Sequence, residues 1–364
     1  MRRAVALAVV ILTLVASYAV SALGEAEPPQ PPEAAARPPL PVRGLHVLGA
    51  NAADVALYER FIRDALPKEG VNVLVWEVNY DYAYQSYPQL ASADGVTRED
   101  VQRVANACRE VGVRLVPQIN CLGHQSWHQY RGALLRAFPE FDETPWVPDN
   151  SPDLYCRSYC PLHPDAHKVV FALIDELADA AEATDFHVGM DEVFYIAEAK
   201  CPRCGGKDPA VVFAGEVQAL HDHLAAKGRT MWMWGDRFID AQATGIGYFE
   251  ASGNGTYPAA DLVPKDIVVC DWHYERVVPT PAYFLGKGFR VAACPWQDEQ
   301  VALGQLEMMR TLRQDNERAL GMLQTTWCGF GDFVRAYYGE GGRRDAQRAV
   351  RCFKALFAAM RAPA

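Results

Sequence analysis

Two adjacent carboxylates, Asp191 and Glu192, follow the apolar run in "FHVGMDEVFY", residues 186–195. Like charges repel, so a paired position at the end of an apolar run calls for a chemical reason. Two carboxyl groups that hydrolyse a glycosidic bond normally flank it from separate strands, which adjacent residues cannot do. The pair fits substrate-assisted hydrolysis instead, in which the sugar's own acetamido group attacks the anomeric carbon. One acid would then donate a proton, and the other would hold and charge-balance the acetamido group.

Polar and aromatic residues also end most of the other apolar runs of the chain. Besides the acid pair, these are Asn79, Asp81, Asn120, His124, Trp234, Asp236, Trp272, Tyr274, Trp296, Asp298 and Trp327. Acids and aromatic residues can end strands without any function, but tryptophan recurs on each of the last four runs. Aromatic faces stack on the C–H faces of pyranose rings, so this pattern predicts a sugar-binding site.

Eight short, β-rich apolar runs are expected to be the strands that position these residues. They lie at 43–50, 71–79, 113–120, 185–192, 230–237, 266–274, 289–296 and 321–329. Continuous apolar runs are typical of strands that are buried on both faces. The even eightfold count predicts an α/β fold, a (β/α)8 TIM barrel in a single catalytic domain, whose active site lies at the carboxyl ends of the strands. A doubly wound open sheet is the competing architecture.

Amphipathic helical periodicity separates most of these runs. It is clearest at Asp100–Val111, Asp165–Ala180, Val211–Lys227 and Ala346–Met360. The connection 241–265 is rich in glycine, and its helical content is doubtful. A helix after nearly every strand is what the barrel requires.

The first 42 residues have the composition of an export segment and a tether. Residues 1–24 begin with two arginines, continue with an apolar run and end in small residues, as a cleavable signal peptide does. An uncleaved signal would be an N-terminal membrane anchor instead. Residues 25–42 are rich in proline and predict an extended linker, so the domain is expected to cover 43–364. The expected location is the periplasm or the extracellular space, and no further run is long and apolar enough to span a membrane in the mature chain.

The overall charge restricts the partners of the chain. Its 364 residues carry 35 basic and 45 acidic side chains, a net charge of −10. Nucleic-acid binding normally needs a basic face, so a nucleic-acid partner is not expected.

In these motifs the sequence resembles glycoside hydrolase family 20, the β-N-acetylhexosaminidases. "HVGMDEV" is similar to the His-x-Gly-x-Asp-Glu motif of that family, and "RGLHVLGA" looks like the first strand of its compact, hexosaminidase D-like members. "VPQINCLGHQSW", "MWMWGDRF", "DWHYE" and "QTTWCGF" resemble its third and later strands. The resemblance covers about 43–338. It implies retaining exo-hydrolysis of a carbohydrate with a terminal N-acetylhexosamine, with no cofactor required for catalysis and no catalytic metal.

The resemblance also implies roles for individual residues. Glu192 matches the general acid and later base, and Asp191 matches the acid that orients the acetamido nitrogen. Tyr274 is similar in place to the tyrosine that hydrogen-bonds the acetamido oxygen. The full set of residues expected to bind the substrate or support the acids is Tyr274, Trp234, Trp272, Trp327, Trp296, His124, His187, Glu77 and Asp236. For His187, a purely structural histidine is an equal alternative.

The sequence departs from the family pattern in two respects. Met190 stands where the family often has a second glycine, and the strand-one arginine of larger members is missing, since Arg43 lies at the opposite end of its run. Glu77, Asp81 or Asp298 could recognise the sugar hydroxyls in its place. Two other functions stay open: a non-catalytic sugar-binding barrel, and a glycosidase that uses distant carboxylates such as Glu77 and Glu192 on sugars without an acetamido group.

Four of the ten cysteines form two close pairs, Cys156 with Cys160 and Cys201 with Cys204. They follow the third and fourth predicted strands, so their loops should be neighbours at the barrel mouth. Four thiolates at this spacing suit a structural zinc ion, and an exported protein could equally form disulfides from them. In both cases they would hold loops beside the acids without taking part in catalysis. The other six cysteines lie in strand or helix contexts, where a buried free thiol is the default.

Overall fold

A computed structural model describes residues 38–362. Eight strands in this segment form a closed barrel in the order β1-β10-β9-β8-β7-β6-β3-β2, and every neighbouring pair is parallel. The strands are β1 (Val42–Leu48), β2 (Val73–Glu77), β3 (Arg114–Cys121), β6 (Asp185–Gly189), β7 (Thr230–Trp234), β8 (Val268–Trp272), β9 (Arg290–Cys294) and β10 (Ala319–Gln324). Each coincides with one predicted run, so the TIM barrel is confirmed and the open sheet is excluded. The predicted signal peptide and most of the predicted linker lie outside the described residues.

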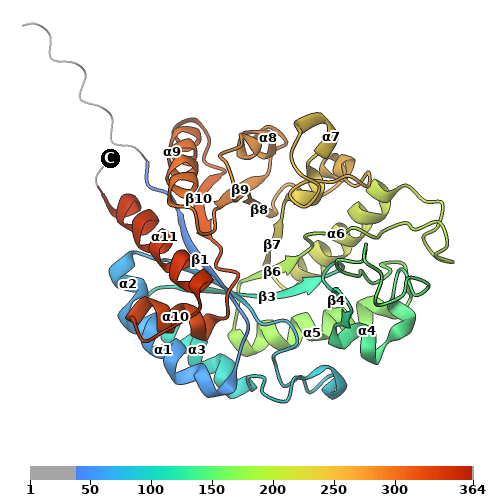
Figure 1. Cartoon of the computed structure of the whole chain (residues 1–364), viewed down its shortest axis with the longest axis horizontal. Helices are drawn as coiled ribbons and strands as arrows, with labels where there is room; N and C mark the ends of the chain where they lie inside the picture. The colour runs from blue at the N-terminus through green and yellow to red at the C-terminus, as the bar shows by residue number, and fades with distance from the viewer. Residues whose placement is uncertain (1–37, 363–364) are drawn as a thin grey trace, which may run out of the picture. The chain divides into compact units, whose positions relative to one another are not determined.

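Helices surround the barrel on its outer side (Figure 1). They are α1 (Val55–Asp64), α2 (Leu66–Glu69), α3 (Arg98–Glu110), α4 (Ala133–Ala137), α5 (Ala166–Ala181), α6 (Pro209–Ala225), α7 (Ala241–Thr244), α8 (Thr280–Gly286), α9 (Glu299–Asp315), α10 (Phe330–Tyr338) and α11 (Arg344–Arg361). The four helices predicted from periodicity are α3, α5, α6 and α11, with ends displaced by one or two residues. Within residues 241–265, the structure has only the short α7 and a 3-10 turn at Tyr257–Asp261, in agreement with the doubt about the helical content of this connection. None of the described helices is long and apolar enough to cross a bilayer.

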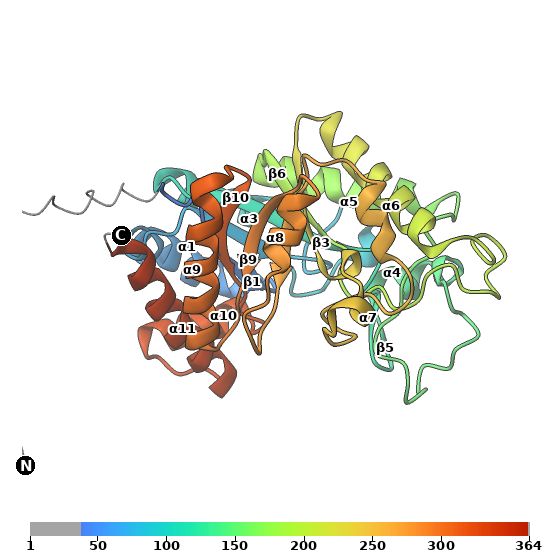
Figure 2. The ribbon, with the colours of Figure 1, turned by 90° about the horizontal axis from the view of Figure 1, so that it is seen from above.

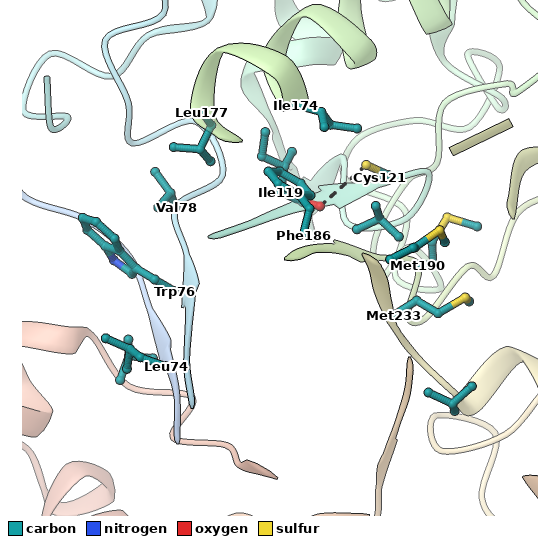
Figure 3. Close-up of a cluster of buried hydrophobic side chains, with 14 of the residues drawn as sticks. Leu74, Trp76, Val78, Ile119, Cys121, Ile174, Leu177, Phe186, Met190 and Met233 are labelled. Atoms are coloured by element: carbon teal, nitrogen blue, oxygen red, sulfur yellow. Dashed lines mark hydrogen bonds between the residues drawn. The ribbon is translucent and has the colours of Figure 1, made fainter. Parts of the chain in front are cut away.

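Residues on each strand alternate between two apolar cores. In β2, Val73 and Val75 pack inside the barrel, whereas Leu74 and Trp76 pack outward against the helices. This alternation is the period-two geometry of a strand. Figure 3 shows part of the outer core, where Trp76 and Phe186 lie among aliphatic and sulfur-containing side chains. The rigid barrel fixes the strand ends that carry the predicted site.

Local capping explains where several helices begin. Thr97 and Asp100 form a reciprocal capping box at the start of α3. Asp298, one of the strand-end acids, accepts hydrogen bonds from Gln300 N and Val301 N and therefore caps α9. Arg43 bonds to the carbonyls of Gly70 and Leu40 at the amino end of β1, away from the strand ends that carry the acids.

Candidate active site

The acid pair sits on an irregular backbone just beyond the last residue of β6. Gly189, Met190 and Glu192 have positive φ angles of 69°, 74° and 48°. A Cβ atom on Gly189 would come within 2.5 Å of Asn120 Oδ1, so this position requires glycine. The reversal turns both carboxylates toward one cavity instead of letting them alternate between the faces of a strand.

This cavity has a volume of about 620 Å3 and lies at the carboxyl ends of the strands. Its size falls within the range of small-molecule sites. The lining residues are Leu48, Glu77, Asn79, Tyr80, Asn120, His124, Ser126, Trp127, Tyr130, Gly132, Tyr155, Asp191, Glu192, Trp272, Tyr274, Trp296 and Trp327. An aromatic wall around two carboxylates is suited to a sugar ring.

His124 joins the two acids. Its Nε2 lies 3.2 Å from Asp191 Oδ2 and 3.1 Å from Glu192 Oε2. Burial alone would lower the pKa of His124, but the charge and hydrogen bond of Asp191, with the hydrogen bond to Glu192, raise this pKa well above its usual range. A cationic His124 therefore offsets the repulsion between the adjacent carboxylates.

Asp236 holds the backbone of the acid pair. Its Oδ2 accepts hydrogen bonds from Glu192 N at 2.9 Å and from Arg237 Nε at 2.6 Å. Burial raises the pKa of Asp236 to about 6, with Asp191 adding to the increase and Arg237 opposing it. Asp236 does not line the cavity, so its predicted contact with substrate is replaced by a positioning contact.

Trp234 and His187 also lie beneath the cavity, which corrects the predicted substrate contact of Trp234 and agrees with a supporting or structural place for His187. Trp234 is fully buried and packs against Trp327, with the ring centroids 5.7 Å apart. His187 Nδ1 accepts the Gly189 N–H at 3.1 Å. Burial, and then the charge of His46, lower the pKa of His187 well below its usual value, so its ring is neutral. Of the two interpretations of His187, this placement favours the structural one.

The other aromatic residues of the prediction do line the cavity. Trp327 donates its Nε1 proton to the Tyr274 hydroxyl at 2.6 Å, and the rings of Trp272 and Tyr274 stack with centroids 5.1 Å apart. Trp296 packs against Tyr274 at 5.5 Å. The Trp327 N–H therefore occupies one acceptor position of the Tyr274 hydroxyl.

Glu77 lines the same cavity, but all of its acceptor sites are occupied. Its Oε2 bonds to His46 Nε2 at 3.0 Å and Gln118 Nε2 at 2.8 Å, and its Oε1 to Asn79 Nδ2 at 2.8 Å and Asn120 Nδ2 at 3.0 Å. A carboxylate has about four lone-pair sites, so a substrate hydroxyl would have to displace one of these donors.

Several lining residues were not assigned from the sequence, namely Tyr80, Trp127, Tyr130 and Tyr155. Burial, and then the negative charge of Glu192, raise the pKa of Tyr155, which is consistent with its place beside the acid. Trp127 is half exposed on the short hairpin β4–β5 (Ser126–Trp127 and Tyr130–Arg131). All but Tyr80 come from the long connection between β3 and α5, and the length of that connection was the available signal.

The cysteine prediction needs a correction. Cys160, Cys201 and Cys204 come together with Glu143, whereas Cys156 lies apart, with its Sγ 3.4 Å from Glu192 O. All ten cysteines, which lie in the described part of the chain, are free. The two cysteine loops are neighbours as expected, but the fourth member of the cluster is a carboxylate that the Cys-x-x-Cys spacing could not reveal.

The barrel, the paired acids and the aromatic cavity define the class of carbohydrate-processing TIM barrels. Comparison with known proteins narrows this class. Residues 70–298, more than half of the chain, match "Glycosyl hydrolase family 20, catalytic domain". The chain therefore belongs to glycoside hydrolase family 20.

Two curated relatives and one solved structure are also similar to the chain. Beta-hexosaminidase A of Caenorhabditis briggsae is 26% identical over 180 residues, which are 44% of this chain and 30% of that protein. Lacto-N-biosidase of Bifidobacterium bifidum is 23% identical over 195 residues, 50% of this chain and 16% of that protein. The chain thus matches less than a third of the length of either relative. The structure of a Flavobacterium johnsoniae chitobiase superimposes with a TM-score of 0.59 at 18% identity, covering 89% of this chain and 51% of that chain, which supports the fold alone.

Proposed function

We propose that this chain is an exo-β-N-acetylhexosaminidase that hydrolyses terminal N-acetyl-β-hexosaminides with retention of configuration. The observation that carries the proposal is the contact of both Asp191 and Glu192 with His124 in a cavity that is also lined by Trp272, Tyr274 and Trp327. Adjacent acids cannot flank a bond, but they can serve a substrate that brings its own nucleophile. Family membership and the names of the relatives support the same activity.

In the first step, the acetamido oxygen attacks the anomeric carbon and the glycosidic C–O bond breaks. Glu192 gives its proton to the leaving oxygen, and an oxazolinium ring forms on the sugar. Asp191 accepts the acetamido N–H and balances the positive charge of the ring. Asp191 lines the cavity, and its buried Oδ1 has no hydrogen-bond partner among residues 38–362, so a rotation of the carboxylate toward that N–H would break no hydrogen bond of Oδ1. Tyr274 donates its hydroxyl proton to the acetamido oxygen.

In the second step, water attacks the anomeric carbon while Glu192, now a carboxylate, takes the water's proton. The oxazolinium ring opens, and the acetamido group and the protonated Glu192 are restored. Two displacements at the same carbon give net retention.

The alternative with two distant carboxylates is less well supported. Glu77 already accepts four hydrogen bonds, so its oxygens are poorly available for attack on a sugar. This alternative predicts hydrolysis of glycosides that lack the acetamido group, and a non-catalytic sugar-binding protein predicts binding without turnover.

A substrate screen tests the proposal. The two epimers, N-acetyl-β-glucosaminide and N-acetyl-β-galactosaminide, would be assayed as chromogenic glycosides beside a plain β-glucoside. We expect turnover of at least one N-acetyl substrate, none of the plain glucoside, and inhibition by a thiazoline that mimics the oxazolinium ring. Binding of N-acetyl sugars by calorimetry with no release of product would refute the enzyme assignment.

A pair of variants tests the role of the general acid. Glu192→Gln removes the proton donor. On an N-acetyl substrate with a poor leaving group, which depends on protonation, kcat should fall by about a hundredfold to ten-thousandfold. Glu317→Gln is the matched control, because Glu317 is exposed just before β10, at the opposite end of the barrel. Equal activity of the two variants would exclude the role of Glu192.

Export by residues 1–24 is a further part of the proposal. It predicts a mature chain in the periplasm or medium whose first residue follows Ala22 or Gly24. N-terminal sequencing of the protein from each cell fraction would test this.

A further inference from the structure

Four buried side chains converge on one point outside the cavity: Glu143, Cys160, Cys201 and Cys204. Cys160 Sγ lies 3.6 Å from Cys201 Sγ and 3.8 Å from Cys204 Sγ, and Cys204 Sγ lies 2.7 Å from Glu143 Oε1. All four candidate ligand atoms lie within 4.8 Å of one another. None of these residues lines the cavity, so none of them is expected to contact the substrate.

Two loops that are distant in the sequence bring the cluster together. Glu143 and Cys160 lie in the connection between β3 and α5, and Glu143 N bonds to Ser158 O at 3.0 Å. Cys201 and Cys204 lie in the connection between β6 and α6, within "CPRCGG". A Cβ atom on Gly205 would come within 2.5 Å of Cys201 O, so this tight turn requires glycine. Figure 2 shows the green and yellow-green segments that follow β3 and β6 on the same side of the barrel.

We propose that Glu143, Cys160, Cys201 and Cys204 bind one structural zinc ion. Zinc in structural sites is tetrahedral with sulfur ligands about 2.3 Å away, which places two such sulfurs about 3.8 Å apart. The sulfur separations of 3.6 and 3.8 Å match this edge length. Glu143 Oε1 lies too close to Cys204 Sγ, at 2.7 Å, to share the ion with it, so the unpaired Oε2 would be the oxygen ligand. Three thiolates and one carboxylate complete a closed, four-coordinate set that leaves no open position for catalysis.

An unpaired oxygen in the cluster points independently to a cation. Glu143 is fully buried, and its Oε2 has no hydrogen-bond partner in the described part of the chain. Its Oε1 accepts the Glu198 N–H at 3.0 Å and lies in contact with the Cys204 thiol. A buried carboxylate that faces three thiols is costly unless a positive charge compensates it. A zinc ion supplies that charge, and the guanidinium of Arg203, which interacts with Cys160, balances part of the excess negative charge of the ligands.

A disulfide accounts for the cluster less well. A bond between any two of the three sulfurs requires a separation of about 2.05 Å. It would leave the third sulfur outside the bond and Glu143 Oε2 still without a partner among residues 38–362. A zinc ion uses all four groups at once.

The zinc site would connect the loop that carries the acid pair with the loop that packs against it. The β6–α6 loop begins with Asp191 and Glu192, and the β3–α5 loop carries Cys156, whose Sγ contacts Glu192 O at 3.4 Å. Because Cys156 is only four residues from Cys160, zinc binding would also limit how far Cys156 can move from Glu192. We expect chelation to lower the melting temperature by several degrees and to reduce kcat less than removal of an acid does.

Metal content of the purified full-length chain tests the proposal. After removal of weakly bound metal, elemental analysis should find about one zinc per chain in the wild type. Cys201→Ser and Cys204→Ser should each lose most of it, whereas Cys156→Ser, which changes a buried cysteine of the same loops outside the cluster, should keep it. Substitution of the wild-type ion by Co2+ should produce thiolate-to-cobalt charge-transfer bands, a readout that needs no variant to fold.

Three results would overturn the site. The first is a metal-free wild type that shows no charge-transfer band with added Co2+. The second is a disulfide between any two of Cys160, Cys201 and Cys204, detected by mass analysis of peptides under non-reducing conditions. The third is zinc that is retained in Cys204→Ser but lost in Glu192→Gln, which would place the ion at His124 and the acid pair. Hydrolysis by the wild type is measured separately, so failure of the zinc site would leave the proposed activity untouched.

Discussion

Glu77 and the acid pair, Asp191 and Glu192, lie on the wall of the same cavity. They differ in how many hydrogen bonds their carboxylate oxygens accept. Glu77 receives four hydrogen bonds, from His46 on β1, from Gln118 and Asn120 on β3, and from Asn79, which follows β2. Asp191 and Glu192 share one cation, His124, and Asp191 Oδ1 has no partner in the described structure. The saturated carboxylate holds the barrel mouth together, whereas the under-coordinated pair can take a substrate as its missing partner.

The backbone shows the same contrast. Glu77 is in register with Leu48 on one side and Gln118 on the other, as in any regular strand. The acid pair follows the end of β6, and both Met190 and Glu192 adopt the left-handed conformation, which is unfavourable for residues other than glycine. Strain of this kind is typical of functional sites, because the surrounding structure must maintain it.

The largest effect on catalysis after loss of Glu192 is expected at Asp191. Asp191→Asn removes the charge that would stabilise the oxazolinium ring, so kcat should fall by about a hundredfold to a thousandfold. Steady-state kinetics on an N-acetyl-β-hexosaminide measure this loss. Glu77→Gln is the comparison and should change kcat by less than about tenfold, because Glu77 already has four partners. If both variants lost kcat equally, the distinction between the two carboxylate groups would be wrong.

The free energy of unfolding should respond more strongly to substitution of Glu77 than to substitution of Asp191. Glu77→Gln replaces an acceptor oxygen with an amide that faces two donors, either His46 and Gln118 or Asn79 and Asn120. The free energy of unfolding should fall by about 1–3 kcal/mol, because buried donors lose their acceptor. Urea denaturation monitored by tryptophan fluorescence measures this change. A Glu77→Gln protein as stable as the wild type would contradict the structural role of the network.

The barrel could be predicted from the sequence because each buried strand is a continuous apolar run. All eight runs correspond to strands, and the weak helical pattern after Trp234 corresponds to a connection that lacks a long helix. Asp191 and Glu192 could be located because strand ends converge in a barrel. Their roles in catalysis stay predictions.

The depth of a residue below the cavity could not be read from the sequence. Trp234 and Trp272 occupy equivalent ends of neighbouring strands, but Trp234 is covered by Trp327 and His187, and Trp272 reaches the cavity. Tyr155 and Glu143 lie in a long connection without periodicity, so their placement depends on tertiary contacts. For the same reason, the sequence could pair Cys160 with Cys201 and Cys204 but could not identify Glu143 as the fourth member.

A pH-dependent contribution to stability is expected from His124. Its pKa is raised in the folded protein, so protonation favours folding. This contribution is fully present below the unfolded pKa of about 6.5 and is lost as the pH rises through the higher folded pKa. The wild type should therefore lose stability relative to His124→Gln as the pH increases above about 6.5. Urea midpoints of both proteins across this range measure the difference, and parallel curves would contradict a cationic His124 between the acids.

The smallest expected effect is a difference in stability between two variants of Met190, the residue between the required glycine and the acids. Its φ of 74° disfavours a side chain, yet its side chain is fully buried in the outer core beside Met233 (Figure 3). The backbone strain at Met190 costs about 1–2 kcal/mol, whereas loss of its apolar packing in a change to alanine costs about 2–5 kcal/mol. Because packing contributes more than the strain costs, methionine is tolerated at this position.

Paired substitutions separate the backbone strain from the packing. Met190→Ala and Met190→Gly both lose the packing, but only glycine removes the strain, so Met190→Gly should be more stable than Met190→Ala by about 1 kcal/mol. Met233, in the regular strand β7, is the matched control. There the order should reverse, with glycine less stable than alanine by about 0.5–1 kcal/mol because of its greater loss of backbone entropy. Chemical denaturation of the four variants measures both differences. If alanine were the more stable replacement at both positions, the backbone before the acid pair would not be strained, and the contrast with Glu77 would rest on hydrogen bonding alone.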